Sequence, residues 1–499
     1  MNYRFLAKIL GQLIAIFGLS FLPSLCWAAW FGEWDSFTAF LESIGVALLF
    51  GGVLYVLGRG AETRMYQRET LGLVGLGWLV LALVGAVPYV MSGTLGCVDA
   101  FFESMSGLTT TGSTVIVDIE AVDKSVLFWR SFSHWLGGMG VIVLFIAVLP
   151  YLGAGGKQLF KSEAPGPDPH GLSPRIRDTA SILWKLYLTL TVVQTACLML
   201  AGMSLYDALC HTFGTLATGG FSTRQASIAA FDSLAIEVII IVFMVVAGTN
   251  FGLFFAMKHG DIWAVVKDSE WRYYLGILVL ATVLISFNLM GFPANGVIDE
   301  TPEAMQVETP DFTPGGAVRV ASFQVVSVMT TTGYGTNNFE KWPPFSQLLL
   351  LMLMFVGGCA GSTGGGIKVV RIIVLCKMAY WRLENTFRPK TVRPIRMGDH
   401  LIDDGLQKRV ATFLMLHMLV FIFGSLVMAG MGLPVMTAVT AVIATLNNIG
   451  PGLEFVGAGH DFHLVPDAGK VLLSFFMAMG RLELFSIVVM LHPGFWKHS

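Results

Sequence analysis

Long apolar stretches separated by short polar connections run through nearly the whole chain. An apolar segment of about 20 residues can span the roughly 30 Å hydrocarbon core of a bilayer as a helix. Because the first stretch is too long for a secretory signal and carries bulky Trp27 at the candidate cleavage point, we expect it to be retained. Ten stretches are long enough, near residues 5–28, 36–58, 69–92, 125–150, 180–203, 230–257, 270–292, 345–377, 407–431 and 468–491. The pattern predicts an all-α membrane protein with ten transmembrane helices.

The distribution of charge predicts how these helices are oriented. The chain is 55% hydrophobic and only 13% charged, which separates it from soluble globular proteins. Lys and Arg are concentrated in the connections 58–69, 151–180 and 368–409, whereas the alternate connections are acidic or neutral. Residues 293–316 contain five carboxylates and no Lys or Arg, namely Asp299, Glu300, Glu303, Glu308 and Asp311. Since positive loops stay in the cytoplasm, both termini are expected to be cytoplasmic.

A short glycine-centred motif recurs four times. The motifs are Thr-Thr-Thr-Gly-Ser-Thr at 109–114, Ala-Thr-Gly-Gly-Phe-Ser at 217–222, Thr-Thr-Thr-Gly-Tyr-Gly at 330–335 and Asn-Asn-Ile-Gly-Pro-Gly at 447–452. If Gly112, Gly219, Gly333 and Gly450 are aligned, the spacings are 107, 114 and 117 residues. Such regular spacing indicates one structural unit used four times.

Each motif follows a segment too short to cross a bilayer. The short helices are expected at 98–108, 206–216, 317–329 and 435–446. Irregular backbone at membrane depth survives only where protein buries it or it lines a wet cavity, so the four loops should line a pathway. The predicted organisation is two N-terminal helices (1–60) followed by four pseudo-symmetric helix–re-entrant loop–helix repeats around one pore, at 69–150, 180–257, 270–380 and 407–491.

The composition of the loops suits a monovalent cation. Glycine allows left-handed backbone angles and a close approach to an ion, and a ring of carbonyls can replace the hydration shell of K⁺. The short helices end at the loops, so their negative dipole ends also favour a cation. No carboxylate lies within the loops, although Mg²⁺ and Ca²⁺ would be expected to need them. Ordinary glycine helix caps would explain one such loop, but they do not explain four.

Two further features point to gating. Six glycines interrupt the apolar stretch of the third repeat within residues 357–366, and they cannot sustain a helix at a cost of about 1 kcal/mol each. They are Gly357, Gly358, Gly361, Gly364, Gly365 and Gly366. This segment could plug the pathway, or it could be a hinge or a site of close helix packing. Arg481 in the last apolar stretch should face a wet interior, where it could repel cations or pair with a carboxylate such as Glu483.

One charge in the first short segment also needs an explanation. Glu103 would be costly to expose to lipid, so it should face protein. It could hold the first loop in place or attract ions, and we favour the structural role.

The four motifs, together with Trp-Leu-Gly-Gly-Met-Gly at 135–140, the glycine break and Met-Gly-Arg at 479–481, resemble the Trk/Ktr/HKT superfamily of cation transporters. The resemblance covers essentially all 499 residues, and the two extra N-terminal helices favour a Trk-type protein. It implies a potassium uptake protein of the bacterial inner membrane that forms a homodimer with one pore per subunit. It also implies a gating loop at 357–366, a role for Arg481 below the filter, and a cytosolic regulatory subunit that binds NAD or ATP.

The resemblance also assigns ion ligands. By alignment on the glycines, carbonyls of four residue pairs would coordinate K⁺, with the adjoining glycines shaping the filter. The pairs are Thr110 and Thr111, Ala217 and Thr218, Thr331 and Thr332, and Asn448 and Ile449, and the glycines are Gly112, Gly219, Gly333 and Gly450. Glycine rather than serine at position 112 favours K⁺ over Na⁺ by the same resemblance.

Other functions remain to be weighed. A symporter that couples K⁺ to H⁺ or Na⁺ is the main alternative, and the apolar segments offer few relay groups for it, Glu103 and His134 among them. An intramembrane enzyme is not expected, because His-Glu-x-x-His and Gly-x-Ser-x-Gly motifs are absent from the sequence. We expect K⁺ as the transported ligand, no covalently bound cofactor, contact with membrane lipid and no nucleic-acid partner.

Overall fold

The structure is a computed structural model of the whole chain. It describes residues 2–61, 67–148, 176–258, 260–291, 313–389, 395–398 and 400–496. The predicted connections 151–180 and 293–316 therefore lie largely outside the described residues, as do Lys390 and Arg393 of the basic connection.

The N-terminal part is a helical hairpin. It contains α1 (Tyr3–Leu19), α2 (Leu22–Phe31) and α3 (Trp34–Leu57). Gly11 of α1 and Gly51 of α3 face each other so closely that a Cβ on either would collide with the other's carbonyl oxygen. Small residues at this crossing let the two backbones approach, which is how helices pack tightly in a membrane.

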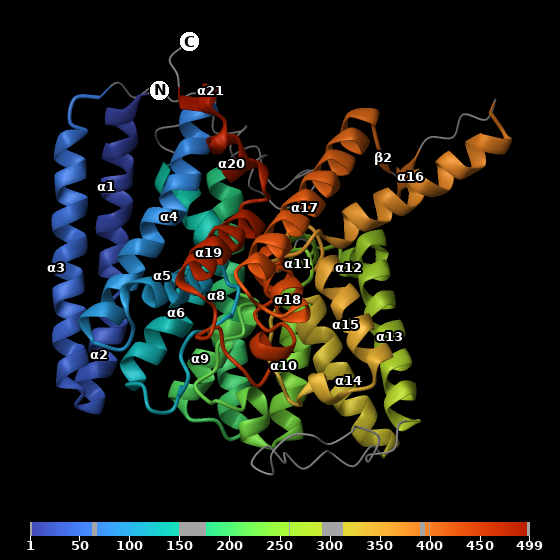
Figure 1. Cartoon of the computed structure of the whole chain (residues 1–499), viewed down its shortest axis with the longest axis horizontal. Helices are drawn as coiled ribbons and strands as arrows, with labels where there is room; N and C mark the ends of the chain where they lie inside the picture. Colours follow the sequence, from blue (N-terminus) through green and yellow to red (C-terminus); the bar gives the residue numbers. More distant parts are fainter. Residues whose placement is uncertain are drawn as a thin grey trace.

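The rest of the chain is a bundle of long and short helices (Figure 1). The longer helices are α4 (Gln67–Met91), α6 (Lys124–Val148), α8 (Ile176–Leu200), α10 (Leu234–Ala247), α13 (Ser269–Met290), α15 (Pro344–Val356), α16 (Val369–Phe387), α17 (Asp404–Gly430) and α19 (Asp467–Arg481). The shorter pieces are α11 (Phe251–Lys258), α12 (Ala264–Lys267), α20 (Phe485–Val488), α21 (Pro493–Trp496) and the 3-10 turns η3 (Ser227–Phe231), η5 (Phe339–Lys341), η6 (Glu454–Val456) and η7 (Val489–Leu491). One small antiparallel ribbon, β1 (Arg396–Met397) with β2 (His400–Leu401), pairs Arg396 with Leu401.

Four short helices end at the four glycine motifs. They are α5 (Cys97–Leu108), α9 (Leu205–Leu216), α14 (Pro314–Met329) and α18 (Val435–Leu446). Three begin within one residue of the expected start, but α14 begins three residues earlier than expected. Thr313 caps it, accepting a hydrogen bond from Gly316 N at 3.2 Å, and Pro314 occupies the first turn, where its missing N–H costs nothing.

The spanning helices are less regular than expected. Six helical stretches of the described chain are long and apolar enough to cross a membrane, or eight if two bent pairs each count as one span. The predicted single helix at 230–257 is wrong, because α10 and α11 meet at 90°. The predicted single helix at 468–491 is also wrong, because α19 meets the segment from Phe485 to Leu491 at 120°. The count of ten stays a prediction, as do the repeat boundaries.

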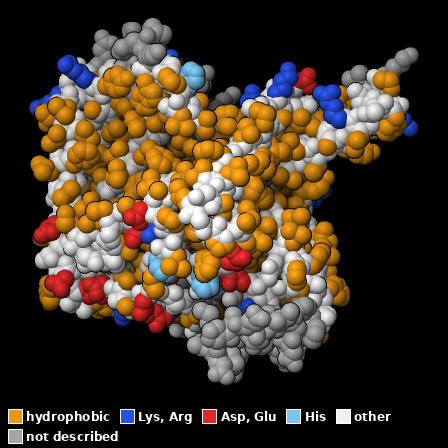
Figure 2. Space-filling model, in the orientation of Figure 1, with side chains coloured by type: hydrophobic (Ala, Val, Ile, Leu, Met, Phe, Trp, Pro, Cys, Tyr) orange, Lys and Arg blue, Asp and Glu red, His pale blue; other side chains and the backbone are white. Residues whose placement is uncertain are grey.

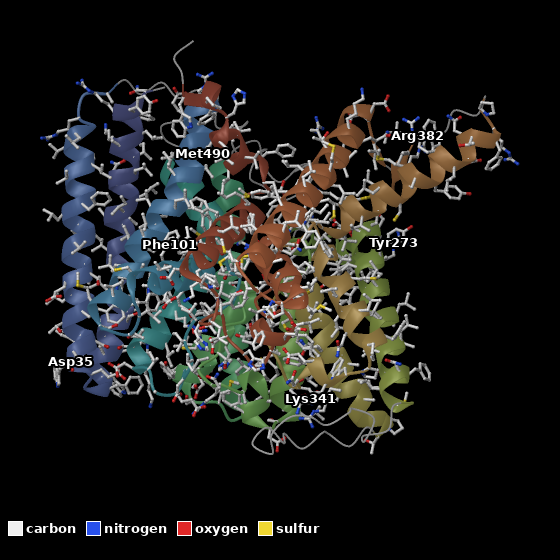
Figure 3. All side chains as sticks on the ribbon, viewed as in Figure 1. Asp35, Phe101, Tyr273, Lys341, Arg382 and Met490 are labelled. Atoms are coloured by element: carbon white, nitrogen blue, oxygen red, sulfur yellow. The ribbon has the colours of Figure 1, made fainter. Side chains whose placement is uncertain are left out.

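The surface is divided by charge. In Figure 2 a broad hydrophobic belt separates an upper edge rich in Lys and Arg from a lower edge where Asp and Glu gather. Figure 3 shows Asp35 and Lys341 near the lower edge and Met490 near the upper edge. Both termini lie at the upper edge (Figure 1), and α16 projects away from the bundle on the same side. The belt has the arrangement expected of a multi-pass membrane protein.

Candidate functional site

The four glycine motifs adopt one backbone conformation. A non-glycine residue has a left-handed φ in each loop: Thr110 at 54°, Thr218 at 55°, Thr331 at 59° and Asn448 at 54°. Two residues later a glycine also has positive φ: Gly112 at 86°, Gly220 at 79°, Gly333 at 82° and Gly450 at 104°. A left-handed non-glycine residue is uncommon, so its recurrence at equivalent positions, three times as threonine and once as asparagine, indicates that the four loops share one conformation.

This conformation corrects the internal alignment of the second loop by one residue. Gly220, not Gly219, matches the glycines of the other three loops. Ala217 is the C-cap of α9 with φ −79°, the place held by Thr109, Thr330 and Asn447 in the other loops. The carbonyl pair equivalent to Thr110 and Thr111 by backbone conformation is therefore that of Thr218 and Gly219, one residue later than the predicted pair Ala217 and Thr218.

The four loops close into a ring. A Cβ on each of the positive-φ glycines would run into a carbonyl oxygen of the next loop. The pairs are Gly112 with Gly219, Gly220 with Thr332, Gly333 with Ile449 and Gly450 with Thr111. In every loop, the carbonyl that is contacted belongs to the residue just before the positive-φ glycine of that loop. Four equivalent carbonyls therefore follow one another around one axis. Glycine is required here both by its φ and by the lack of space.

Hydroxyl groups support the ring from behind. The hydroxyls of Thr109 and Thr111 lie 2.7 Å apart, and those of Thr330 and Thr332 lie 2.8 Å apart. Ser113 Oγ donates to the carbonyl of Gly450 at 2.8 Å, which joins the first loop to the fourth. Asn448 Nδ2 donates to Thr111 Oγ1 at 2.9 Å across the same junction.

A buried ion pair joins the first loop to the second. Glu103 on α5 accepts hydrogen bonds from Thr114 Oγ1 and from Val115 N, both at 2.9 Å, just after the first glycine. Its partner Arg130 on α6 lies at 2.6 Å and also donates to the carbonyl of Ser222 at 3.0 Å. Both side chains are almost completely buried. These contacts agree with the structural role expected for Glu103.

Tyr334 ties the third loop to the second in a similar way. Its hydroxyl donates to the carbonyl of His211 on α9 at 3.0 Å, while Ser327 Oγ donates to the carbonyl of Tyr334 at 2.7 Å. The His211 ring in turn contacts Ser222 Oγ at 3.0 Å. Side-chain hydrogen bonds therefore connect the first loop to the second and the fourth, and the third loop to the second, which restrains the carbonyl positions.

The glycine-rich segment lies against the same loops. We call residues 357–368, between α15 and α16, the inner loop. Its Gly365 N donates to Thr331 Oγ1 at 2.7 Å, and its Gly366 N donates to the carbonyl of Asn447 at 3.1 Å. Thr363 Oγ1 donates to the carbonyl of Leu216 at 2.9 Å. The inner loop therefore touches the C-terminal ends of three of the four short helices.

Glycine is needed at several places in the inner loop. Gly357, Gly361 and Gly366 have φ between 73° and 77°, which side chains rarely adopt. A Cβ on Gly365 would collide with the carbonyl oxygen of Asn447, and a Cβ on Gly364 would lie 3.0 Å from that of Thr330. The inner loop can approach the filter loops this closely only because these side chains are absent.

Arg481 binds the inner loop rather than a carboxylate. It donates to the carbonyl of Thr363 at 2.6 Å and to that of Gly137 on α6 at 2.9 Å. Of the two alternatives considered for Arg481, pairing with Glu483 is not found, because Glu483 lies 2.6 Å from Arg371. The chain turns sharply at Glu483 and Leu484, which both have positive φ. Because of this turn, the side chains of Arg481 and Glu483 reach different partners.

The carboxylate of Glu270 connects the inner loop to the first turn of α16. One carboxylate oxygen, at the start of α13, accepts from Ala360 N at 2.8 Å and from Val370 N at 3.1 Å. The sequence interpretation did not single out this residue or Arg130, and it named Tyr334 within the third motif without giving its side chain a role. Arg130 stood out as a charge within a predicted spanning segment, which is the signal that could have found it.

The described residues contain no cluster of His, Cys, Asp or Glu with the geometry of a metal site. The ring offers backbone carbonyl oxygens instead, with hydroxyls behind them. Neutral oxygens of this kind can replace the water around a weakly hydrated monovalent cation.

Comparisons with known proteins show what the whole chain is similar to. The model of the TrkH family, described as cation transport protein, matches residues 36–496. The chain is 38% identical to the Trk system potassium uptake protein TrkH of Escherichia coli K12, and 31% identical to TrkG of the same organism. These alignments cover 100% and 99% of each chain. The crystal structure of the potassium transporter TrkH from Vibrio parahaemolyticus superposes with a TM-score of 0.86 at 36% identity, covering both chains completely.

Proposed function

The chain belongs to the TrkH family of cation transport proteins, and on that basis we propose that it is a potassium uptake protein of a Trk system. Potassium is the cargo named for its full-length relatives. The ring of four equivalent carbonyls is the observation that supports the proposal most directly, since it places neutral oxygens around one axis.

The proposed ion ligands follow the corrected alignment. They are the carbonyls of Thr110 and Thr111, Thr218 and Gly219, Thr331 and Thr332, and Asn448 and Ile449, shaped by Gly112, Gly220, Gly333 and Gly450. The short helices α5, α9, α14 and α18 end at these loops, and their negative dipole ends stabilise a cation at the centre.

Ion flux into proteoliposomes that contain the chain tests this function. We expect K⁺ and Rb⁺ to enter faster than Na⁺, driven by membrane potential alone. Gly112→Ser should reduce this discrimination, because its side chain would displace the carbonyl of Gly219. Gly202→Ser is a control, since Gly202 also has positive φ but has open space around its Cβ position. Equal K⁺ and Na⁺ flux in the unmodified protein would contradict the proposal. Flux that requires a proton or sodium gradient would instead support the symporter.

The inner loop and Arg481 are proposed to gate this pathway. The loop sits beside the filter loops, and Arg481 fastens it to α6 through the carbonyls of Thr363 and Gly137. Replacing Arg481 with Gln removes a positive charge and part of this attachment. We expect higher K⁺ flux in Arg481→Gln, with no change in Arg382→Gln on the exposed part of α16.

The assembly and location are also proposals. We propose a multi-pass protein of the bacterial inner membrane with both termini cytoplasmic, on the side where Lys and Arg gather (Figure 2). A homodimer is supported by α16, which leaves the bundle (Figure 1) with Tyr380, Leu383 and Phe387 each more than two-thirds exposed. A cytosolic subunit that binds NAD or ATP would control the gate from this side. Cross-linking at Leu383 and co-purification with such a subunit test these two contacts.

A further inference from the structure

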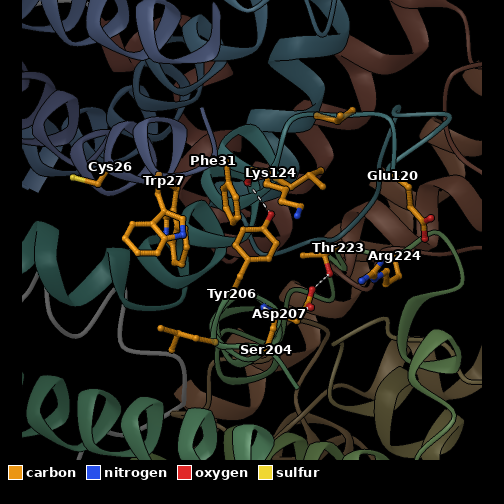
Figure 4. Close-up of a pocket in the computed structure, with 14 residues that line it drawn as sticks. Cys26, Trp27, Phe31, Glu120, Lys124, Ser204, Tyr206, Asp207, Thr223 and Arg224 are labelled. Atoms are coloured by element: carbon orange, nitrogen blue, oxygen red, sulfur yellow. Dashed lines mark hydrogen bonds between the residues drawn. The ribbon is translucent and has the colours of Figure 1, made fainter. Parts of the chain in front are cut away.

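A cavity of about 680 Å³ lies beside the residues that follow the second glycine loop. Its walls come from α2, from the first turn of α6, from the start of α9 and from the segment just after the second glycine loop. Figure 4 shows Trp27, Phe31 and Tyr206 on one side of it and Glu120, Thr223 and Arg224 on the other. One wall is therefore aromatic and the opposite wall is polar.

The aromatic wall belongs to the boundary between hydrocarbon and water. Trp27 stacks on Phe31 with their ring centres 5.3 Å apart, at the end of the first helical stretch long enough to span a membrane. Trp30 and Trp34 beside them are 79% and 65% exposed. Tryptophan collects at this level of membrane proteins because its ring is partly apolar and partly polar. The cavity thus opens where lipid headgroups begin.

Two cations and two carboxylates line the cavity, namely Lys124, Arg224, Glu120 and Asp207. Within the described residues, neither Lys124 nor Arg224 forms a salt bridge. Lys124 Nζ lies 4.7 Å from the centre of the Phe31 ring. Asp207 also lines the cavity and keeps its negative charge, while its two oxygens accept hydrogen bonds from Thr223 Oγ1 at 2.7 Å and from Ser204 Oγ at 2.8 Å.

We propose that this cavity binds a membrane phospholipid, whose phosphate lies between Lys124 and Arg224 and whose acyl chain covers Trp27 and Phe31. A phospholipid fits such a cavity, because its phosphodiester can bind two cations while its acyl chains cover an apolar wall. Glu120 also lines the cavity and would suit the ammonium of phosphatidylethanolamine. The site adjoins the pathway, since Thr223 directly follows Ser222, whose carbonyl is held by Arg130.

Native mass spectrometry of the full-length protein in mild detergent tests the site. We expect delipidated protein to retain phosphatidylethanolamine or phosphatidylglycerol when either is added. The double variant Lys124→Gln/Arg224→Gln should bind roughly tenfold more weakly, since two charge-assisted hydrogen bonds are lost. Lys258→Gln/Lys408→Gln removes the same charge from exposed positions elsewhere and should bind normally. Preference for phosphatidylethanolamine that disappears in Glu120→Gln would support the role of Glu120.

Equal lipid retention by the two double variants would overturn the proposal. So would displacement of the lipid by millimolar glycerol phosphate, because a soluble anion would then be the occupant. A photoactivatable phospholipid on the unmodified protein gives an independent readout that does not depend on a variant folding. It should label residues 24–31 or 204–224, and labelling confined to other segments would contradict the site. These measurements record binding without ion flux, so their failure leaves the proposed transport function intact.

Discussion

Glu103 and Arg130 form an ion pair at 2.6 Å in which both side chains are at most 2% exposed. The pair does more than neutralise two charges inside the protein. Glu103 holds the chain just after Gly112, and Arg130 holds the carbonyl of Ser222 just after Gly220. A single interaction therefore fixes the distance between two neighbouring parts of the ring.

Glu103→Gln should destabilise the protein strongly. The substitution leaves Arg130 buried without a counter-charge, which costs about 3–5 kcal/mol. The thermal unfolding midpoint in detergent measures the effect. Asp261→Asn is the control, since it breaks a pair with Lys267 whose side chains are 54% and 70% exposed, worth about 0–1 kcal/mol. Similar midpoints for the two variants would show that the buried pair does not hold the loops.

Gly220→Ala should abolish selective K⁺ flux, whereas Gly335→Ala should leave it almost unchanged. An added Cβ on Gly220 meets the carbonyl of Thr332 at a φ of 79°. Gly335 has no positive φ and open space at its Cβ position, so alanine fits there without strain. Flux of K⁺ and Na⁺ in proteoliposomes distinguishes the two variants. A selective Gly220→Ala pore would show that the second loop does not take part in the ring.

The sequence pattern predicted the four loops because glycine and short hydroxyl residues recur at similar spacing. It did not show that Gly220 rather than Gly219 corresponds to Gly112, because both are glycine and only the positive φ of Gly220 and its contact with Thr332 distinguish them. The break between α10 and α11 was equally hidden within an apolar run. There the carbonyl of Gly248 accepts from Cys359 N at 2.9 Å, a contact with a segment about 110 residues away in the chain. A contact between residues so far apart in the chain produces no periodic pattern in the sequence.

Glu270→Ala should raise K⁺ flux through the unmodified filter, by roughly tenfold if the gate is governed by these contacts. The amides of Ala360 and Val370 would lose their shared acceptor, and each unmet buried donor costs about 1–3 kcal/mol. Glu270→Gln keeps an acceptor oxygen and serves as the control. Flux should be measured without any cytosolic subunit. Unchanged flux in Glu270→Ala would mean that Glu270 does not hold the inner loop closed.

Glu340 should make stability depend on pH. Glu340 lies in η5, outside the spanning helices, and its pKa is raised to about 7. Burial is the main cause, and the nearby carboxylate of Glu454 acts in the same direction. Hydrogen bonding by Asn338 and the charge of Lys341 lower the pKa and offset part of this shift. Its ordinary pKa is 4.5. The folded state therefore holds this proton more tightly than the unfolded state, so stability falls as pH rises from about 4.5 to 7 and stays lower above that.

Glu340→Gln should remove this dependence and raise stability at pH 8 by an amount on the order of 1–3 kcal/mol. Unfolding midpoints at pH 5.5 and pH 8 measure it, with Asp35→Asn on an exposed surface as the control. A variant whose midpoint falls between these pH values as much as that of the unmodified protein would exclude Glu340 as the source.

The inner loop is one segment between α15 and α16, although the ring is built from four loops. If this segment is the gate, a single moving part opens the whole pathway, and no agreement among four separate gates is needed. Single-channel recordings of such a pore should show two current levels per subunit, with no intermediate conductance, and a regulator should change how long each level lasts rather than its size. A pore formed by four loops can then open in one step, because all four loops lie on one chain.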